Sequence, residues 1–472
     1  MIKKIFTLLL LSFSLHVFSQ ETLITLNNSL KTSSSDIKDI IPIVNEKTGE
    51  IGFFVADAKN VYGYKINANF EVTKKITSEE KSRKYKTLIG NSIFSDDSYR
   101  VFLTNNSQDK FSSINFSFNN NTTSLNEFEL NKGEKFIQTV SYNNKFYLIS
   151  GSKLTNGLYI HTFDEDGNPK RNKIDFSSLR FINKIGKSTK LTDILIKKEN
   201  IKKFEENTPN SIEMTSELRK MYQRDNLILF SFDHHKMFTQ VLQIDLNTFE
   251  ASSFQFKKPS LGEKAKKTNS YINGENVFTI AVTKDKFTVE ILDFNTGNLI
   301  KEYSATKNDS ITFKNTPIIQ EGGMLNDYRE LGKTKRFLRR IASGNTGVSV
   351  RKTGNLYHVI IGGYIEQKMN GGMMMPFGGI PLASLGSVTV FFNPVQLAFN
   401  SFENNKATRI ESLFDENFNH LKGAIKENAF DKIKSVKSSN NKGSTVFKYK
   451  DFYIKTDYHS FAKDFRFRKF SD

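Results

Sequence analysis

The sequence predicts an all-β protein in which one small sheet unit is copied about seven times. A short phrase recurs after strand-like segments: an apolar residue, Asp or Asn, any residue, and Asn or Asp. Alternating apolar residues precede each phrase, as in strands. An Asp or Asn side chain can accept the backbone N–H two residues on, so each phrase is expected to form a hairpin turn. The six expected structural turn residues are Asn67, Asn119, Asp164, Asp245, Asp293 and Asp415.

The spacing of the phrases indicates the kind of repeat. Asn67, Asn119 and Asp164 follow one another at steps of 52 and 45 residues, and Asp245 and Asp293 are 48 residues apart. Four-stranded sheets that repeat at about 40 to 50 residues close into β-propellers of about 4 to 8 blades. The chain therefore resembles a β-propeller of about seven four-stranded blades with short helical insertions. It has no WD dipeptide, Kelch Gly-Gly signature or Asp-box that would name a family.

The last units follow the repeat less regularly. Residues 353–364 resemble the first strand of a sixth unit, whose turn phrase is either at residues 402–405 or at Asp415. A final copy spans residues 441–458. Strand-like residues Thr22 to Leu26 are expected to complete the final sheet, which would tie the two ends of the chain together and leave no free edge.

Residues 1–19 are expected to be a secretory signal peptide. Lys3 and Lys4 precede an apolar run from Ile5 to Leu15, and Ser19 marks the expected cleavage site. The run is shorter than the roughly 20 residues that a membrane-spanning helix needs. The remainder, residues 20–472, is expected to be a single exported β-propeller domain, periplasmic, on the outer surface or secreted. Its expected insertions lie near residues 194–223, 326–344 and 365–386.

Composition excludes several kinds of chemistry. The chain contains no Cys, which removes disulfides, thiolate catalysis and Cys-ligated metals. Its net charge is +18, or +16 once Lys3 and Lys4 leave with the signal peptide. Such a charge supports weak contact with polyanions or membrane surfaces, but only 14 of the 68 basic residues are Arg, the residue that phosphate sites favour. No specific nucleic-acid site is expected.

The segment at residues 365–386 is a candidate contact element. Met373, Met374, Met375 and Phe377 lie between pairs of glycine, which places flexible, polarisable side chains on an adaptable backbone. These side chains could touch a partner protein, a membrane or an apolar ligand. The alternative, which we favour, is that the segment folds back and fills gaps in the disc, because large exposed apolar patches are uncommon.

The segment at residues 326–344 is a second candidate. It holds four of the chain's 14 Arg, among them Arg336, Arg339 and Arg340. Helical spacing would place the apolar residues on one side and the basic ones elsewhere, as expected of an anion-binding or partner-binding surface. A solvated basic face is the alternative with the stronger general support.

Two groupings contain residue types found in metal sites, and neither is taken as one. The run Asp233-His234-His235 is too compact for its three side chains to converge on one ion. Asp164 and Asp175 stand at the first and twelfth positions of a calcium loop, but Pro169 occupies the sixth, where that loop needs Gly. We expect no metal and no cofactor.

The sequence favours a binding role over catalysis. It contains no phosphate-cradling Gly-Lys-Ser/Thr loop, no Gly-x-Ser-x-Gly elbow and no His-Glu-x-x-His motif. We therefore expect a non-catalytic binding or scaffold protein of the cell envelope that contacts a protein or polysaccharide partner through its inter-blade loops. The alternative is an exported glycan-acting hydrolase or lyase with paired carboxylates at the propeller channel. Channel carboxylates with shifted pKa values would favour that alternative.

Overall fold

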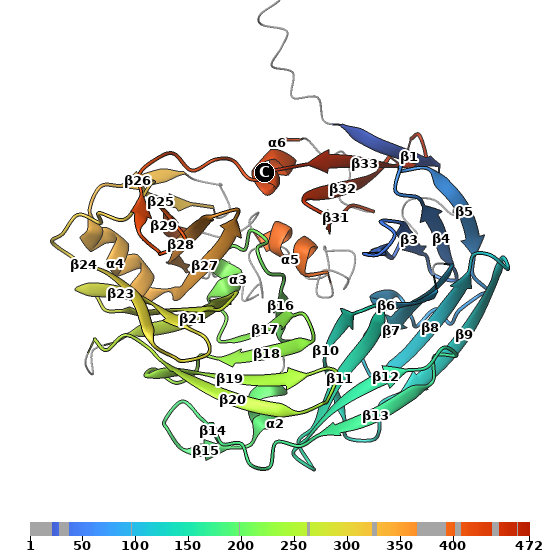
Figure 1. Ribbon diagram of the computed structural model, residues 1–472, viewed down its shortest axis with the longest axis horizontal. Helices are drawn as coiled ribbons and strands as arrows, with labels where there is room; N and C mark the ends of the chain where they lie inside the picture. The colour runs from blue at the N-terminus through green and yellow to red at the C-terminus, as the bar shows by residue number, and fades with distance from the viewer. Residues whose placement is uncertain are drawn as a thin grey trace, which may run out of the picture.

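The computed structural model contains seven radially arranged sheets of four or more strands, counted over the residues that it describes (Figure 1). The protein is therefore a β-propeller, as the turn spacing predicted, and we call each of these sheets a blade. The described residues are 21–27, 37–95, 97–197, 199–261, 265–322, 328–365, 393–401, 407–436, 443–459 and 461–472. The expected signal peptide and the Met-rich segment lie outside them.

Blades 1 to 3 are antiparallel meanders whose last strand lies at the rim (Figure 1). Blade 1 consists of β2 (Asp39–Val44), β3 (Ile51–Ala56), β4 (Val61–Ile66) and β5 (Val72–Thr77). Blade 2 consists of β6 (Thr87–Ser95), β7 (Ser98–Thr104), β8 (Lys110–Ser117) and β9 (Thr122–Glu129). Blade 3 consists of β10 (Lys135–Tyr142), β11 (Lys145–Ser152), β12 (Gly157–Phe163) and β13 (Pro169–Ile174).

Blades 4 and 5 repeat this order, and blade 4 carries one extra strand. Blade 4 consists of β17 (Arg219–Arg224), β18 (Leu227–Phe232), β19 (Phe238–Asp245) and β20 (Ala251–Lys257), with β16 (Lys202–Phe204) parallel to β17. Blade 5 consists of β21 (Lys267–Asn273), β22 (Asn276–Val282), β23 (Lys286–Asp293) and β24 (Leu299–Thr306). A hairpin of β14 (Phe181–Ile182) and β15 (Ser188–Thr189) precedes blade 4.

Blades 6 and 7 complete the ring with strands from distant parts of the chain. Blade 6 consists of β27 (Asn345–Thr353), β28 (Leu356–Tyr364) and β29 (Ala407–Phe414), with β25 (Ile318–Glu321) and β30 (His420–Leu421) paired to β29 and β26 (Arg329–Leu331) paired to β25. Blade 7 consists of β31 (Thr445–Tyr449), β32 (Phe452–His459), β33 (Asp464–Phe470) and β1 (Thr22–Asn27). The pairing of β1 with β33 confirms the predicted closure.

Five helices lie in connections between strands within the described ranges. They are α2 (Leu191–Leu195), α3 (Ile212–Thr215), α4 (Thr334–Ser343), α5 (Pro394–Ser401) and α6 (Ala429–Ser435). In Figure 1, α3 and α5 lie toward the centre of the ring and α4 lies over the blades at its left. Ser211 caps α3 by accepting the N–H of Met214, and the neighbouring Asn210 side chain donates to the Tyr271 hydroxyl at 3.1 Å.

The connections divide into two faces. At one end of every blade is a short turn that joins the first strand to the second, and in blades 1 to 6 a second short turn follows the third strand; residues 45–50 form the longest of these turns. We call this end the turn face. At the other end, the insert face, are the loops from second to third strand and most of the connections between blades. The connections with α2 and α5 leave the sheets at the insert face, and α4 begins beside that face, where the Thr334 hydroxyl donates to the Asp309 carbonyl at 2.6 Å. By contrast, α3 follows β16 at the turn face, and α6 lies beside the end of β33 at the same face, where the N–H of Ala429 donates to Asp472.

The core lies between neighbouring blades, because successive residues of a strand point to opposite faces of its sheet. Phe53 of β3 packs edge-on against Phe465 and Phe467 of blade 7, with ring centroids 5.2 and 4.9 Å apart. The next residue, Phe54, packs against Phe116 of blade 2 at 4.9 Å. One pair of adjacent phenylalanines thus joins three blades of this chain, which contains 43 Phe and no Trp.

Candidate functional site

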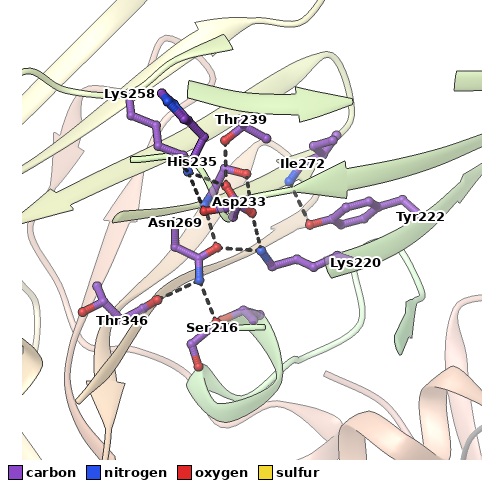
Figure 2. A network of polar contacts seen from close by, with 12 residues as sticks. Ser216, Lys220, Tyr222, Asp233, His235, Thr239, Lys258, Asn269, Ile272 and Thr346 are labelled. Atoms are coloured by element: carbon purple, nitrogen blue, oxygen red, sulfur yellow. Dashed lines mark hydrogen bonds and ion pairs between the residues drawn. The ribbon is translucent and has the colours of Figure 1, made fainter. Parts of the chain in front are cut away.

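A buried charge network joins blades 4 and 5 (Figure 2). Asp233 follows β18 directly, and its carboxylate lies 2.8 Å from the Nζ of Lys220 and 3.0 Å from the Nζ of Lys258. All three side chains are fully buried. The hydroxyls of Thr239 and Ser270 donate to the same carboxylate at 2.7 and 3.0 Å. The carboxylate is therefore fully paired inside the protein.

Asn269 extends this network to blade 6. Lys220 donates to the Asn269 Oδ1 at 2.6 Å. The Asn269 Nδ2 donates to the carbonyls of Ser216 and Thr346, each at 2.8 Å, and Thr346 belongs to β27 (Figure 2). The network thus fixes the inner strands of three consecutive blades side by side.

The electrostatics of the network favour a structural role. Burial alone would raise the pKa of Asp233, but Lys220 and Lys258 hold it far below its ordinary value. Burial in turn lowers the pKa of both lysines. Because none of the three side chains reaches solvent, the network can tie blades together but cannot meet a substrate.

The histidines beside Asp233 do not join it in a metal site. The His234 Nε2 lies 2.5 Å from the Ile182 carbonyl of the β14–β15 hairpin, and the His235 ring stacks on Phe238 with centroids 4.0 Å apart. Sequence reasoning missed the lysine partners. One of them, Lys258, has a sequence signal. It comes directly after the fourth strand of its blade, and Asp233 comes directly after the second strand.

Blade 3 contains a Ser–His–Glu grouping without the geometry of a catalytic triad. The Ser150 Oγ lies 2.8 Å from the Glu134 Oε2 and 2.9 Å from the His161 Nε2. Glu134 also approaches that same Nε2, at 3.4 Å, whereas a triad carboxylate holds the Nδ1. Ser150 is fully buried, and burial lowers the pKa of His161. The three side chains form a buried set of hydrogen bonds. The partly exposed Arg171 also pairs with Glu134, at 2.7 Å.

The charged side chains of a cluster on blade 6 also pair with one another. The Arg409 guanidinium lies 2.5 Å from Glu321 and 2.9 Å from Glu411, and Glu411 also pairs with His358 at 2.8 Å. Burial alone would raise the pKa of Glu411, but His358 and Arg409 hold it at about 2. Since two carboxylates neutralise Arg409, its guanidinium is not available to an anionic ligand.

The structural turn residues follow the third strand of a blade. Asn67, Asp245, Asp293 and Asp415 each accept the backbone N–H two residues on, at 3.0, 2.7, 3.1 and 2.9 Å. Asp164 accepts from the N–H of Asn168, four residues on, at 2.8 Å. The turn at Asp415 follows β29, whereas residues 402–405, the other candidate for this turn, lie outside the described residues.

Asn119 differs from the other turn residues, because its side chain bonds to the Asp97 carboxylate.

Asp164 and Asp175 are not placed to share one calcium ion. The six residues of β13 separate Asp164 from Asp175, which at about 3.3 Å per residue places them about 20 Å apart. Asp175 instead accepts the N–H of Ser177 at 3.0 Å. Among the described residues, no group of three His, Asp or Glu side chains is placed to hold a metal ion.

Of the predicted partner-binding residues, Arg336, Arg339 and Arg340 lie on α4. Phe337 and Ile341 on the opposite side of this helix are fully buried. Arg336 and Arg339 are exposed and Arg340 is half-buried. The helix thus presents a basic surface to solvent, whereas Met373, Met374, Met375 and Phe377 lie outside the described residues.

A small pocket opens at the turn face between blades 4 and 5. Phe204, Glu206, Tyr222, Gln223, Arg224, Leu229, Ile272 and Gly274 line it. Its charged groups are already paired: Arg224 lies 3.1 Å from Glu275, and Glu206 accepts the N–H of Gly274. The pocket has room for about one water molecule, so it cannot hold an organic ligand.

Comparison with known proteins adds no family. No protein-family model and no curated protein matches the chain. Among solved structures, it is similar to the Nup133 β-propeller domain of Vanderwaltozyma polyspora, with 9% identity, 96% of this chain and 99% of the other covered, and a TM-score of 0.36. It is also similar to an oligogalacturonate lyase in complex with manganese, with 9% identity, 92% and 96% covered, and a TM-score of 0.33. Likenesses this distant do not bear on function.

None of the described helices is long and apolar enough to cross a bilayer.

Proposed function

We propose that the protein is an exported, non-catalytic binding or scaffold protein of the cell envelope, which contacts a protein or polymer partner through its insert face. One observation carries the proposal: the loops from second to third strand and most of the connections between blades lie at this face, whereas most connections at the turn face are short turns. Loops held by a rigid scaffold are the usual place for binding residues, because they can vary without disturbing the core.

The polar clusters described above also favour binding over catalysis. Asp233 has its partners within a fully buried network, and Ser150 is fully buried. By contrast, α4 presents Arg336 and Arg339 to solvent near the insert face. A partner with acidic groups would find its complement there.

A capture experiment tests the proposal. The protein is immobilised and incubated with envelope extract, and the retained material is compared among variants. Replacing Arg336, Arg339 and Arg340 with Ala is expected to reduce retention. The matched control replaces Lys47, Lys74 and Lys75, exposed at the turn face and rim of blade 1, and is expected to leave retention unchanged. Equal loss in both variants would indicate bulk charge and contradict the proposal.

One observation favours the alternative, a glycan-acting hydrolase or lyase. Burial raises the pKa of Glu205, which follows β16 near the centre of the ring, and burial lowers the pKa of the neighbouring Lys203. Perturbed groups of this kind are candidates for acid–base chemistry. Release of new chain ends from acidic or neutral glycans, abolished in Glu205→Gln, would support this alternative.

A further inference from the structure

Large apolar side chains are unevenly distributed over the described surface. The three most exposed are Phe461, Leu154 and Ile185, at 103%, 83% and 66%. All three lie at the insert face: Leu154 and Phe461 in loops from second to third strand, and Ile185 at the tip of the β14–β15 hairpin. Met237, in the corresponding loop of blade 4, is 52% exposed. The turn face has no apolar side chain as exposed as these first three within the described ranges.

The fold does not require these apolar tips. The same loop occurs in every complete meander, so the blades serve as controls for one another. In blade 1 its tip carries Lys59, and in blade 5 it carries Asp285, both in polar turns. Since Leu154 and Phe461 extend into solvent, they contribute little to packing. We therefore infer that these side chains contact a partner outside the chain.

Each apolar tip has lysine beside it. Lys153 precedes Leu154, Lys236 precedes Met237, and Lys463 lies two residues after Phe461. The β14–β15 hairpin follows the same pattern, because Lys184 and Lys187 flank Ile185. An apolar side chain next to a cation suits the boundary of an anionic bilayer, where the apolar group enters the acyl region and the ammonium meets the headgroups.

The spacing of the tips favours a membrane over a protein partner. Leu154, Ile185 and Met237 belong to the neighbouring blades 3 and 4 and to the connection between them, whereas Phe461 belongs to blade 7 across the ring, so the four tips do not form one contiguous cluster (Figure 1). Protein interfaces concentrate their apolar anchors in one central, contiguous cluster. Separate tips on one flat face can all enter a fluid surface together.

We propose that the insert face docks on an anionic lipid bilayer, into which Leu154, Ile185, Met237 and Phe461 insert. Lysines beside them, and the basic surface of α4, supply the attraction to the headgroups. This inference rests on the proposed function only in using the same face. It goes beyond that function in naming a lipid surface as the occupant.

Vesicle co-sedimentation tests the inference with purified protein lacking residues 1–19. The vesicles contain phosphatidylcholine alone or an equimolar mixture with phosphatidylglycerol. The test variant is Leu154→Ser, Ile185→Ser and Phe461→Ser combined. The control variant is Leu299→Ser, Ile300→Ser and Leu356→Ser combined, all at the turn face and 55%, 43% and 43% exposed. Thermal unfolding checks that both variants remain folded.

Wild type is expected to bind the anionic vesicles, with partitioning that weakens as salt is raised. The test variant should lose at least about fivefold in partitioning, because each removed apolar tip weakens insertion, and the control variant should match wild type. Failure of wild type to bind, or equal loss in both variants, would overturn the inference. If vesicles are not bound but an envelope protein is captured through the insert face, the inference fails and the proposed function stands.

Discussion

Lys81 and Lys258 occupy the same place in two different blades. Lys81 follows the fourth strand of blade 1, and its Nζ donates to the carbonyls of Asp57 and Ala58 at 2.9 and 3.2 Å. Lys258 follows the fourth strand of blade 4, and its Nζ donates to the carbonyls of Asp233 and His235 at 3.2 and 3.0 Å. Blades 1 and 4 thus share a buried lysine that holds the loop after the second strand.

Removing the charge of Asp233 should destabilise the protein strongly. Asp233→Asn leaves Lys220 and Lys258 buried without their counter-charge, and breaking a buried ion pair in this way costs about 3–5 kcal/mol. Urea unfolding measures the change. The control is Asp285→Asn, which removes the exposed partner of Lys307 and should change stability by less than about 1 kcal/mol. Similar effects of the two substitutions would contradict a role for the buried network.

The buried Lys81 should make stability depend on alkaline pH. Burial lowers its pKa to about 8 from the ordinary 10.5. Between these values the unfolded chain keeps a proton that the folded protein has lost, so raising the pH favours the folded state. The stability of wild type relative to Lys81→Met should therefore increase from pH 8 to 10.5, as measured by urea midpoints. A flat or falling difference would show that Lys81 stays protonated in the folded protein.

The cluster around Glu411 should contribute stability that acid removes. Its pKa is about 2 in the folded protein and 4.5 ordinarily, so its contribution is complete above 4.5 and is lost as the pH falls toward 2. Wild type should lose stability over this window more steeply than Glu411→Gln. Glu416→Gln, which alters an exposed pair with Lys352, serves as the control and should follow wild type. Parallel curves for all three proteins would contradict the assigned pairing.

The turns and the ring closure could be predicted because their signals are local. The turn at Asp245 depends on a side chain and an N–H two residues away, and the alternating apolar residues of β1 suffice to mark it as a strand. The repeat spacing then supplied the architecture.

The remaining features depend on distant partners. Asp233 and Lys258 are 25 residues apart and meet only because β18 and β20 end at the same face of blade 4. Residues 194–223 were expected as an insertion, yet they include β16 and most of β17, whose sequence lacks the apolar alternation of the other strands. The pairing of β25 with β29 was likewise not predicted, because its partner follows it by more than 80 residues.

Site-specific photocrosslinking tests most directly whether the insert face is the binding surface. A photoreactive residue is placed at Leu154 or Phe461 on the insert face, or at Leu299 or Leu356 on the turn face. Each protein is irradiated with intact envelope material, and its adducts are analysed by mass spectrometry. We expect adducts with protein, polymer or lipid from the two insert-face positions and none from the turn-face positions. Adducts from Leu299 and Leu356 alone would contradict binding through the insert face.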